Sequence, residues 1–259
     1  MTTQPVKCLA AVLFSAFFAA GAQAGCYQQL KQRLPDAGTI IFGELHGSAE
    51  IPQFFFDCAR EFVENKEAVN IALEFQASEN ALVEKFMRGE IGEADLVKGP
   101  HWGRQDGRAS LAMLRLLRDL KALSASGVRV SGFDLSGYDP DREKAMMRNF
   151  MSVYSRAGYN LVLTGNVHAR LTQGVPWNPD FVPFAKHLHD HVANVVSLDA
   201  HYPAGTAWVC APDCGIKQLN ATDAGKRAPA DIVYSSENPA FSGYFRVPGI
   251  TASRPVIEK

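Results

Sequence analysis

Short apolar runs alternate with longer amphipathic runs along most of the chain, and this alternation constrains the fold more than any other feature. The apolar runs have the length of strands and lie at 39–43, 69–74, 128–133, 160–165 and 194–199. The amphipathic runs lie near 49–65, 77–88, 108–125, 140–157 and 181–190. Strands that alternate with helices need crossover connections, and strands with little apolar–polar alternation are buried on both faces. The sequence therefore predicts an α/β fold with a mostly parallel central sheet and helices on both faces.

The chain after residue 200 has a different pattern, β-rich and irregular. Two further short apolar runs lie there, at 206–210 and 231–235. We expect this tail to add antiparallel strands at an edge of the sheet. No internal repeat or long linker divides the chain, so residues 25–259 are expected to form a single α/β domain.

Residues 1–24 have the features of a secretory signal peptide. Lys7 is the only charged residue there, an apolar stretch follows it, and Ala22-Gln23-Ala24 supplies a cleavage site. The apolar stretch is too short to cross a bilayer. We expect cleavage near Ala24 and a periplasmic or secreted product with no membrane span in the mature chain. A lipid anchor on Cys26 is disfavoured because Gln23 is a poor first residue for a lipobox.

The charge of the mature chain argues against nucleic acid as a partner. Without Lys7 there are 26 − 1 = 25 basic residues against 27 acidic ones, and no basic stripe with interleaved aromatic residues is present. Motifs for a serine nucleophile elbow, a P-loop or a dinucleotide fingerprint are absent from the sequence. We therefore expect a small-molecule or peptide substrate rather than a nucleotide cofactor or a nucleic acid.

Four cysteines remain after signal cleavage, and an even number in an exported chain indicates disulfides. Three pairings exist among Cys26, Cys58, Cys210 and Cys214. We favour a small loop closed by Cys210–Cys214, which leaves Cys26 to pair with Cys58. The competing interpretation, a metal site at CAPDC, has neither the usual zinc spacing nor a histidine close by in sequence.

Polar side chains stand where four successive predicted strands end: Glu44, His46, Glu74, Asp134, Asn166 and His168. Open α/β sheets bind ligands beyond the carboxyl ends of their strands, so we expect these residues to form one site. Each alone has a structural explanation, since Glu44 would cap the next helix and Glu74 would pair with an arginine. Charged groups are rarely buried without partners, however, and four such placements at one edge favour a functional site.

Two chemistries suit these residues. In the first, a histidine oriented by a carboxylate acts as general base on water, and a second acid or histidine handles the leaving group. In the second, His46, His168 and Glu74 hold a divalent ion (Zn, Mn or Co) that acidifies bound water. The sequence leaves both open. Glu50, one turn into the following helix, is expected to orient His46 or to pair with Arg142.

Five segments, in this order, resemble one known superfamily: FGELHGSAE, IALEF, GFD, REKAMMRN and TGNVHAR. The superfamily joins erythromycin-esterase-like hydrolases, ChaN-like haem-binding uptake proteins and Tiki-type metalloproteases, and the matches cover residues 39 to about 170. The resemblance implies a catalytic or metal-binding pair at Glu44 and His46, with Glu74 and His168 as partners. It further implies that Arg142 supplies a positive charge to the substrate or to a site carboxylate.

The function expected from these observations is that of an exported esterase- or amidase-like hydrolase. Glu44 and His46 would activate water, and Asp134, Asn166 and Trp177 would contact the substrate. Trp208, inside a strand-like run, is expected in the core.

The alternative function is a haem- or iron-binding uptake protein of the ChaN-like type without catalysis. His187 and His191 are four residues apart, and this spacing would place them on one helix face, with Tyr202 as a further candidate ligand.

Overall fold

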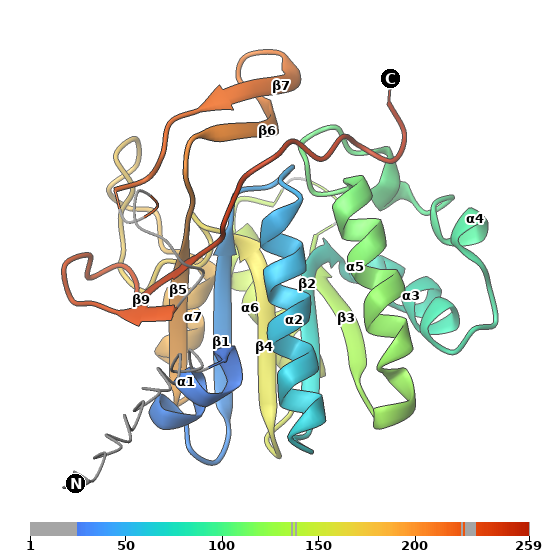
Figure 1. The fold of residues 1–259 in the computed structure, drawn as a ribbon, viewed down its shortest axis with the longest axis horizontal. Helices are drawn as coiled ribbons and strands as arrows, with labels where there is room; N and C mark the ends of the chain where they lie inside the picture. Colours follow the sequence, from blue (N-terminus) through green and yellow to red (C-terminus); the bar gives the residue numbers. More distant parts are fainter. Residues whose placement is uncertain (1–24, 136, 138, 224, 226–231, 259) are drawn as a thin grey trace, which may run out of the picture.

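The computed structural model describes residues 25–135, 137, 139–223, 225 and 232–258, so the predicted signal peptide lies outside the described residues. A seven-stranded sheet forms the centre, in the order β3-β2-β4-β1-β5-β9-β8. Its strands are β1 (Gly38–Glu44), β2 (Val69–Gln76), β3 (Arg129–Asp134), β4 (Tyr159–Gly165), β5 (Val195–His201), β8 (Ile232–Tyr234) and β9 (Gly243–Arg246). All neighbours are parallel except β8 and β9. The predicted fold class is confirmed (Figure 1).

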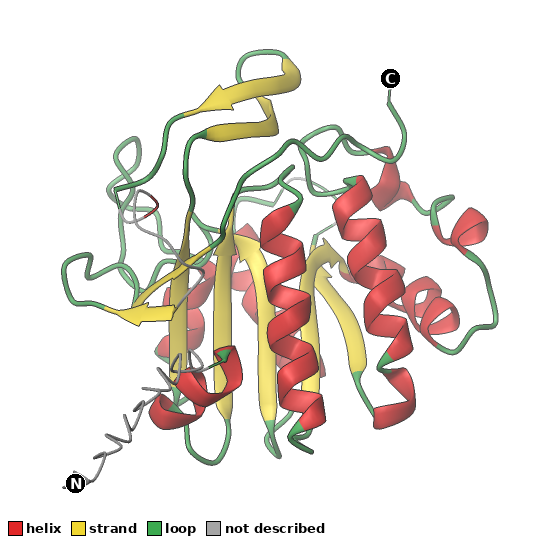
Figure 2. Ribbon diagram, in the orientation of Figure 1, coloured by secondary structure: helices red, strands yellow, loops and turns green. Residues whose placement is uncertain are grey.

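Helices cover both faces of this sheet (Figure 2). They are α1 (Cys26–Arg33), α2 (Glu50–Glu64), α3 (Asn80–Met87), α4 (Glu93–Leu96), α5 (Leu111–Ala122), α6 (Arg142–Val153) and α7 (Phe184–His189), with short 3₁₀ turns η1 (Ala77–Glu79), η2 (Pro100–Gly103) and η3 (Ser124–Ser126). Successive side chains of a strand point to opposite faces. Ile40 and Phe42 of β1 accordingly pack in the cluster that contains α2 and α5, whereas Ile41 packs in the cluster that contains α6 and α7.

One predicted strand does not join the sheet as expected. Residues 206–210 form β6 (Gly205–Cys210), which pairs only with β7 (Cys214–Leu219) in a separate antiparallel hairpin, and β7 was not predicted. The edge beside β5 is instead taken by the parallel strand β9. The predicted strand at 231–235 is confirmed as β8, antiparallel to β9 at the end of the sheet.

The two predicted disulfides are confirmed. Cys26–Cys58 joins α1 to α2 with Cα atoms 5.4 Å apart, and Cys210–Cys214 closes the β6–β7 hairpin. Disulfides of this kind are typical of oxidising compartments. Among the described residues, no helix is long and apolar enough to cross a membrane.

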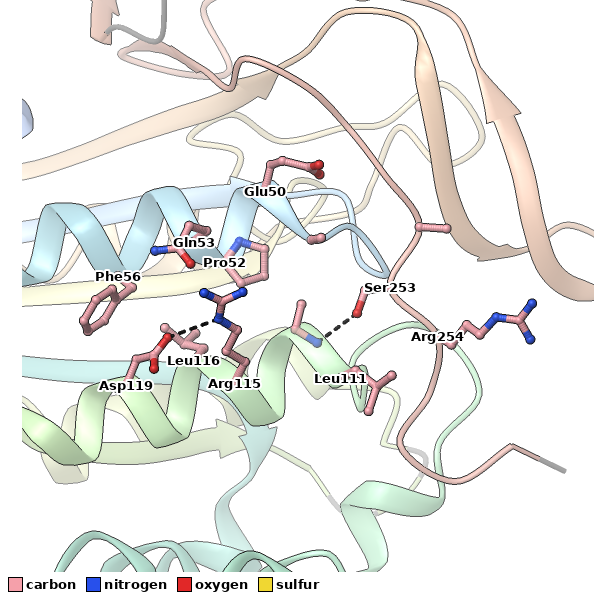
Figure 3. Close-up of a pocket in the computed structure, with 13 residues that line it drawn as sticks. Glu50, Pro52, Gln53, Phe56, Leu111, Arg115, Leu116, Asp119, Ser253 and Arg254 are labelled. Carbon is pink, nitrogen blue, oxygen red and sulfur yellow. Dashed lines mark hydrogen bonds and ion pairs between the residues drawn. The ribbon is translucent and has the colours of Figure 1, made fainter.

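The C-terminal segment crosses the ends of α2 and α5 (Figure 3). Ala112 N donates to Ser253 Oγ at 2.8 Å, and Leu111 N donates to the Arg254 carbonyl at 2.9 Å. Thr251 donates through its backbone N and its hydroxyl to the carboxylate of Glu50. The chain end therefore fixes the start of α5, and the loop before α5 enters the site described next.

Candidate functional site

The strand order brings the predicted polar residues to one edge of the sheet. Strands β3, β2, β4 and β1 are consecutive neighbours, and Glu44 pairs in register with Gly165 at the end of β4. Asp134 ends β3, and Glu74 lies two residues before the end of β2. The parallel arrangement therefore converts four separate strand ends into one cluster, as the sequence predicts.

Glu74 lies at the centre of the cluster and is almost fully buried. Its Oε1 accepts hydrogen bonds from Arg108 Nη1 at 3.1 Å and from Arg142 Nη2 at 3.0 Å. Its Oε2 accepts from Thr164 Oγ1 and from the backbone N of Gly165, both at 2.7 Å. Both carboxylate oxygens are thus engaged by several donors, two of which are cations.

The charge of Glu74 follows from these surroundings. Burial alone would raise the pKa of Glu74, but the positive charge and hydrogen bond of His46 and the positive charge of Arg108 outweigh burial and hold the pKa well below its ordinary value of 4.5. Glu74 is therefore a carboxylate at neutral pH.

His46 lies between two carboxylates. Its Nδ1 is 3.0 Å from Glu44 Oε1, and its Nε2 is 3.4 Å from Glu74 Oε2. Because both partners accept hydrogen bonds, both ring nitrogens carry protons. Burial would lower the pKa of His46, but Glu74 and Glu44 together raise it to about 10. His46 is therefore an imidazolium at neutral pH.

His168 has partners of opposite kinds. Its Nδ1 lies 2.8 Å from Glu143 Oε2, which accepts, and its Nε2 lies 2.9 Å from Arg142 Nη1, which only donates. These partners assign the proton to Nδ1 and a lone pair to Nε2. Glu143 Oε2 also accepts from the backbone N of Phe184 at 2.9 Å, at the start of α7. The site thus contains two carboxylate–histidine pairs, Glu44–His46 and Glu143–His168, in different protonation states.

Two arginines bind Asp134, which was predicted to contact substrate. Arg108 Nη1 donates to Asp134 Oδ2 at 2.9 Å, and Arg142 Nε donates to Oδ1 at 2.9 Å. Both carboxylate oxygens of Asp134 are occupied, so its contacts in this structure hold the two guanidinium groups in place rather than leaving it open to a ligand. Arg142 is brought to the site as predicted.

The sequence did not identify Arg108, Asp106 or Glu143 as site residues. Asp106 Oδ2 accepts from Arg108 Nη2 at 2.6 Å and from Arg104 Nη2 at 2.9 Å, which fixes the guanidinium that reaches Glu74. The alternating charges in GRQDGRAS, just before α5, are the signal that could have pointed to this loop. For Glu143 the signal was its place beside Arg142 in the motif REKAMMRN.

A cavity of 290 Å³ opens beside the cluster. Its walls include Glu44, His46, Asn166 and His168, together with Cys210 of the β6–β7 hairpin. A second cavity of 520 Å³ shares Val167 and His168 with the first and continues past the start of α6 to His187. His168 therefore borders both cavities, and a molecule that extended across them would contact it.

Two of the predicted site residues, Trp177 and Glu50, lie away from the cluster, and a third, Asn166, has a further partner. The Trp177 side chain is 73% exposed in the loop between β4 and α7, and it borders neither cavity. Glu50 binds Thr251 rather than His46 or Arg142. Asn166 lines the smaller cavity, but its side chain also hydrogen-bonds Asp199, whose pKa burial raises to about 6.

The donor set does not fit a divalent metal held by His46, His168 and Glu74. Both nitrogens of His46 are proton donors, and both nitrogens of His168 have hydrogen-bond partners. Glu74 carries two guanidinium groups that would repel a cation. Among the described residues, no group of three or more His, Cys, Asp or Glu side chains could hold a metal ion.

This donor set leads to a prediction about metal removal. We expect treatment with EDTA followed by desalting to leave the rate of substrate turnover unchanged within about twofold. The reason is that the nitrogens of His46 and His168 and the carboxylate of Glu74 already have hydrogen-bond partners in place of a metal ion. Initial rates before and after treatment, together with elemental analysis of the same samples, test this. A loss of activity that zinc, manganese or cobalt restores would contradict it.

The residues suggested for haem binding do not form the expected pair. Helix α7 ends at His189, so His191 lies in the following turn, where its Nδ1 is 2.7 Å from the His187 carbonyl. His187 alone borders the larger cavity. Tyr202 directly follows β5, on the segment that leads to the hairpin. The helix-face argument for a haem site is therefore wrong.

No protein family matches this sequence, and no curated protein matches it significantly. Solved structures are similar in fold. A protein described as a succinoglycan biosynthesis protein has a TM-score of 0.66 and 11% identity, over 88% of this chain and 91% of its own. A protein from Bacillus cereus has a TM-score of 0.64 and 12% identity, over 89% and 93%. At such low sequence identity, these similarities establish the fold only. The activity has to be inferred from the residues of the site.

A structure of ChaN from Campylobacter jejuni with cofacial haem is more distant. Its TM-score is 0.43 and its identity 13%, over 68% of this chain and 86% of its own. A similarity at this level carries no argument about this chain.

Proposed function

We propose that this protein is an exported hydrolase that cleaves an ester or amide bond of a small-molecule or peptide substrate by acid–base catalysis. One observation carries the proposal: two carboxylate-oriented histidines flank Glu74 and border the same cavity, one protonated and one with a lone pair. A pair of titratable groups with opposite protonation at one site is the arrangement that supplies both an acid and a base.

His168 is the base in this mechanism. Its Nε2 lone pair now accepts from Arg142 Nη1, and a water molecule that replaces this contact would give its proton to Nε2 as its oxygen attacks the substrate carbonyl. Glu143, bound to Nδ1, stabilises the imidazolium that forms. The guanidinium of Arg142, with a side chain 27% exposed, is then available to the oxyanion.

His46 is the acid. As the carbon–oxygen or carbon–nitrogen bond breaks, His46 gives a proton to the departing alkoxide or amine, and Glu44 holds the ring in position. Proton exchange with solvent then recharges His46 and discharges His168. These roles reverse the expectation from sequence that His46 activates water, because a ring whose nitrogens both face carboxylates has no lone pair to accept a proton.

The fold and the motifs support the proposal from separate directions. The five motif segments resemble hydrolases of the erythromycin-esterase-like superfamily. Each segment contributes a side chain to the hydrogen-bonded cluster around Glu74, and the first and last segments line the smaller cavity. Two confirmed disulfides agree with export. The haem-uptake alternative has less support, because His191 lies beyond the end of α7 and, of its candidate ligands, His187 lines the larger cavity whereas His191 and Tyr202 do not.

A matched pair of substrates tests the acid role. An ethyl ester needs a proton on its leaving group, whereas the p-nitrophenyl ester of the same acid does not. Activity on the ethyl ester is expected to fall as pH rises through about 10, where His46 loses its proton, while the p-nitrophenyl ester shows no such fall. His46→Gln is expected to reduce kcat on the ethyl ester about 10²-fold or more, and on the p-nitrophenyl ester much less.

The measurement is the pH profile of kcat for both esters, corrected for spontaneous hydrolysis, in the wild type and in His46→Gln. If the two esters lose activity equally in His46→Gln, His46 is not the acid. If the wild type hydrolyses no ester or amide of any acid tested, the proposed function itself is wrong.

A further inference from the structure

The loop 103–108 brings the guanidinium group of Arg108 to the site, and contacts from other parts of the chain hold this loop in place. It carries Arg108, which donates to Glu74 and Asp134, and Asp106, which fixes Arg108. The loop lies between the short turn η2 and helix α5 and belongs to no helix or strand beyond Gly103. Its position therefore depends on contacts from other parts of the chain.

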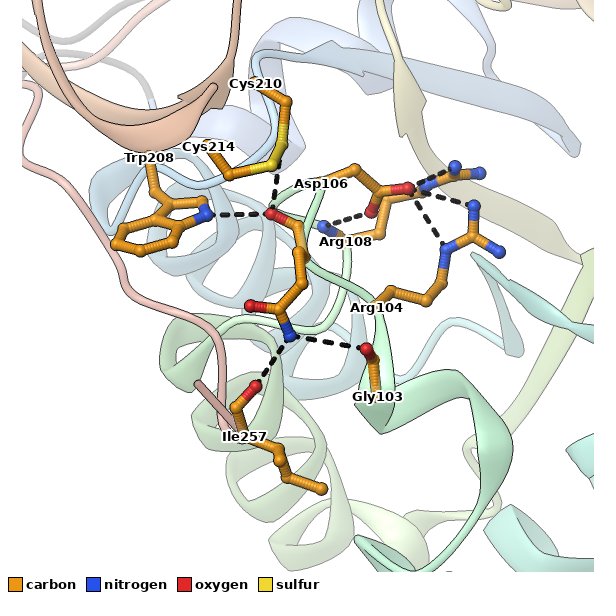
Figure 4. The surroundings of a disulfide bond; sticks show 9 residues. Gly103, Arg104, Asp106, Arg108, Trp208, Cys210, Cys214 and Ile257 are labelled. Atoms are coloured by element: carbon orange, nitrogen blue, oxygen red, sulfur yellow. Dashed lines mark hydrogen bonds and ion pairs between the residues drawn. A yellow bond between two sulfur atoms is a disulfide. The ribbon is translucent and has the colours of Figure 1, made fainter. Parts of the chain in front are cut away.

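The β6–β7 hairpin provides two of these contacts, both at one carbonyl (Figure 4). Trp208 Nε1 donates to the Gln105 carbonyl oxygen at 2.8 Å, and Cys210 Sγ lies 3.3 Å from the same oxygen. The Gln105 side chain donates to the Ile257 carbonyl at 2.7 Å, which ties the loop to the C-terminal segment as well. Trp208 was expected in the core, but it is half-buried and contacts this loop.

The backbone of the β6–β7 hairpin also packs closely against the loop after β1. Trp208 N donates to the Gly47 carbonyl at 2.9 Å. Gly47 and Gly107 both have positive φ, and a Cβ on Gly47 would collide with the Trp208 carbonyl. A Cβ on Gly107 would lie 2.7 Å from Gly47 N and 2.9 Å from the carbonyl carbon of His46. The hairpin, the loop that carries His46 and the loop that carries Arg108 are therefore in backbone contact.

The disulfide gives the hairpin the stiffness that this role needs. A two-stranded hairpin by itself is only marginally stable in water. Cys210 and Cys214 are directly opposed on β6 and β7, and their bond closes the turn two residues beyond Trp208. Cys210 and Val209 also form part of the wall of the smaller cavity.

We propose that Trp208, stiffened by the Cys210–Cys214 disulfide, is a positioning residue that holds the loop 103–108 so that Arg108 stays against Glu74 and Asp134. The role rests on the proposed hydrolase for its effect on turnover, but the positioning itself is measurable without any substrate. Trp208 acts through Arg108 and has no contact of its own with the reacting atoms.

The first test is hydrogen–deuterium exchange of the peptide that spans 103–110 in the full chain. Trp208→Phe removes the indole N–H while keeping an aromatic ring, and it is expected to speed exchange of this peptide roughly three- to tenfold, the range that one lost hydrogen bond supports. Cys210→Ala/Cys214→Ala is expected to do the same. Gln218→Ala, an exposed change on the same hairpin, is the matched control and should change nothing. Unchanged exchange in Trp208→Phe overturns the proposal.

The second test is a double-mutant cycle with Arg108→Gln on an ester that the wild type hydrolyses. Trp208→Phe is expected to lower kcat/KM roughly three- to tenfold in the wild type, and to have no further effect once Arg108 is replaced. Equal effects in both backgrounds would mean that Trp208 does not act through Arg108, which overturns the proposal. Faster exchange in a protein that hydrolyses no substrate would uphold the positioning and reject the hydrolase.

Discussion

His168→Ala is expected to lower kcat by about 10²–10⁴-fold, the contribution typical of a positioned general base. The variant removes the lone pair at Nε2 that lies 2.9 Å from Arg142, and no other unprotonated imidazole pairs with a carboxylate at this cavity among the described residues. Initial rates on an ester that the wild type hydrolyses give the effect. Thermal unfolding of the same samples shows whether the fold is retained.

Two controls separate catalysis from packing. His189→Ala removes an exposed histidine at the end of α7 and is expected to leave kcat unchanged. Added imidazole is expected to restore part of the activity of His168→Ala, since the truncation leaves room for a free base beside Glu143. A kcat for His168→Ala within fivefold of the wild type would reject His168 as the base.

Glu74→Gln is expected to destabilise the protein by about 3–5 kcal/mol at neutral pH, the usual cost of breaking a buried ion pair from one side. The change removes the negative charge that Arg108, Arg142 and the protonated His46 all face, and it leaves Asp134 as the carboxylate that the two arginines share. Urea denaturation of wild type and variant at pH 7 measures the difference in the free energy of unfolding.

The stability difference between the wild type and Glu74→Gln should depend on pH. The pKa of Glu74 lies well below 4.5 in the folded protein, so its ionised form contributes stability that is present above the unfolded pKa and lost as pH falls below it. The stability difference between wild type and Glu74→Gln should therefore shrink as pH falls from about 4.5. A difference that stays constant with pH would show that the effect is steric rather than electrostatic.

Glu79→Gln is the matched control for burial. Glu79 is nearly as buried as Glu74, but its Oε1 accepts from the backbone N of His101, and burial raises its pKa. A neutral side chain already suits that position, so the substitution is expected to cost less than about 1 kcal/mol. A large cost at both positions would assign the Glu74 effect to packing.

The sequence determines the order of strands and helices and the edge at which Glu44, Glu74 and His168 meet. Apolar runs of strand length, separated by amphipathic helices, permit a parallel sheet, and a parallel sheet brings its carboxyl ends to one edge. The even number of cysteines after the predicted signal peptide, in a chain expected to be exported, likewise favoured the two disulfides that the structure contains. These features depend on local periodicity and on general rules of topology, both of which can be read along the chain.

The tertiary structure alone decided which groups meet there and in what charge state. Arg108 reaches Glu74 from a loop 34 residues further along the chain, and Glu143 reaches His168 across 25 residues. Strand β6 was read as an edge strand, yet with β7 it forms a hairpin that holds the Arg108 loop. The protonation of each histidine depends on the partners that its ring nitrogens meet, and the proposed roles of His46 as the acid and His168 as the base rest on those partners. Such contacts are non-local, so no pattern of spacing within one segment could specify them.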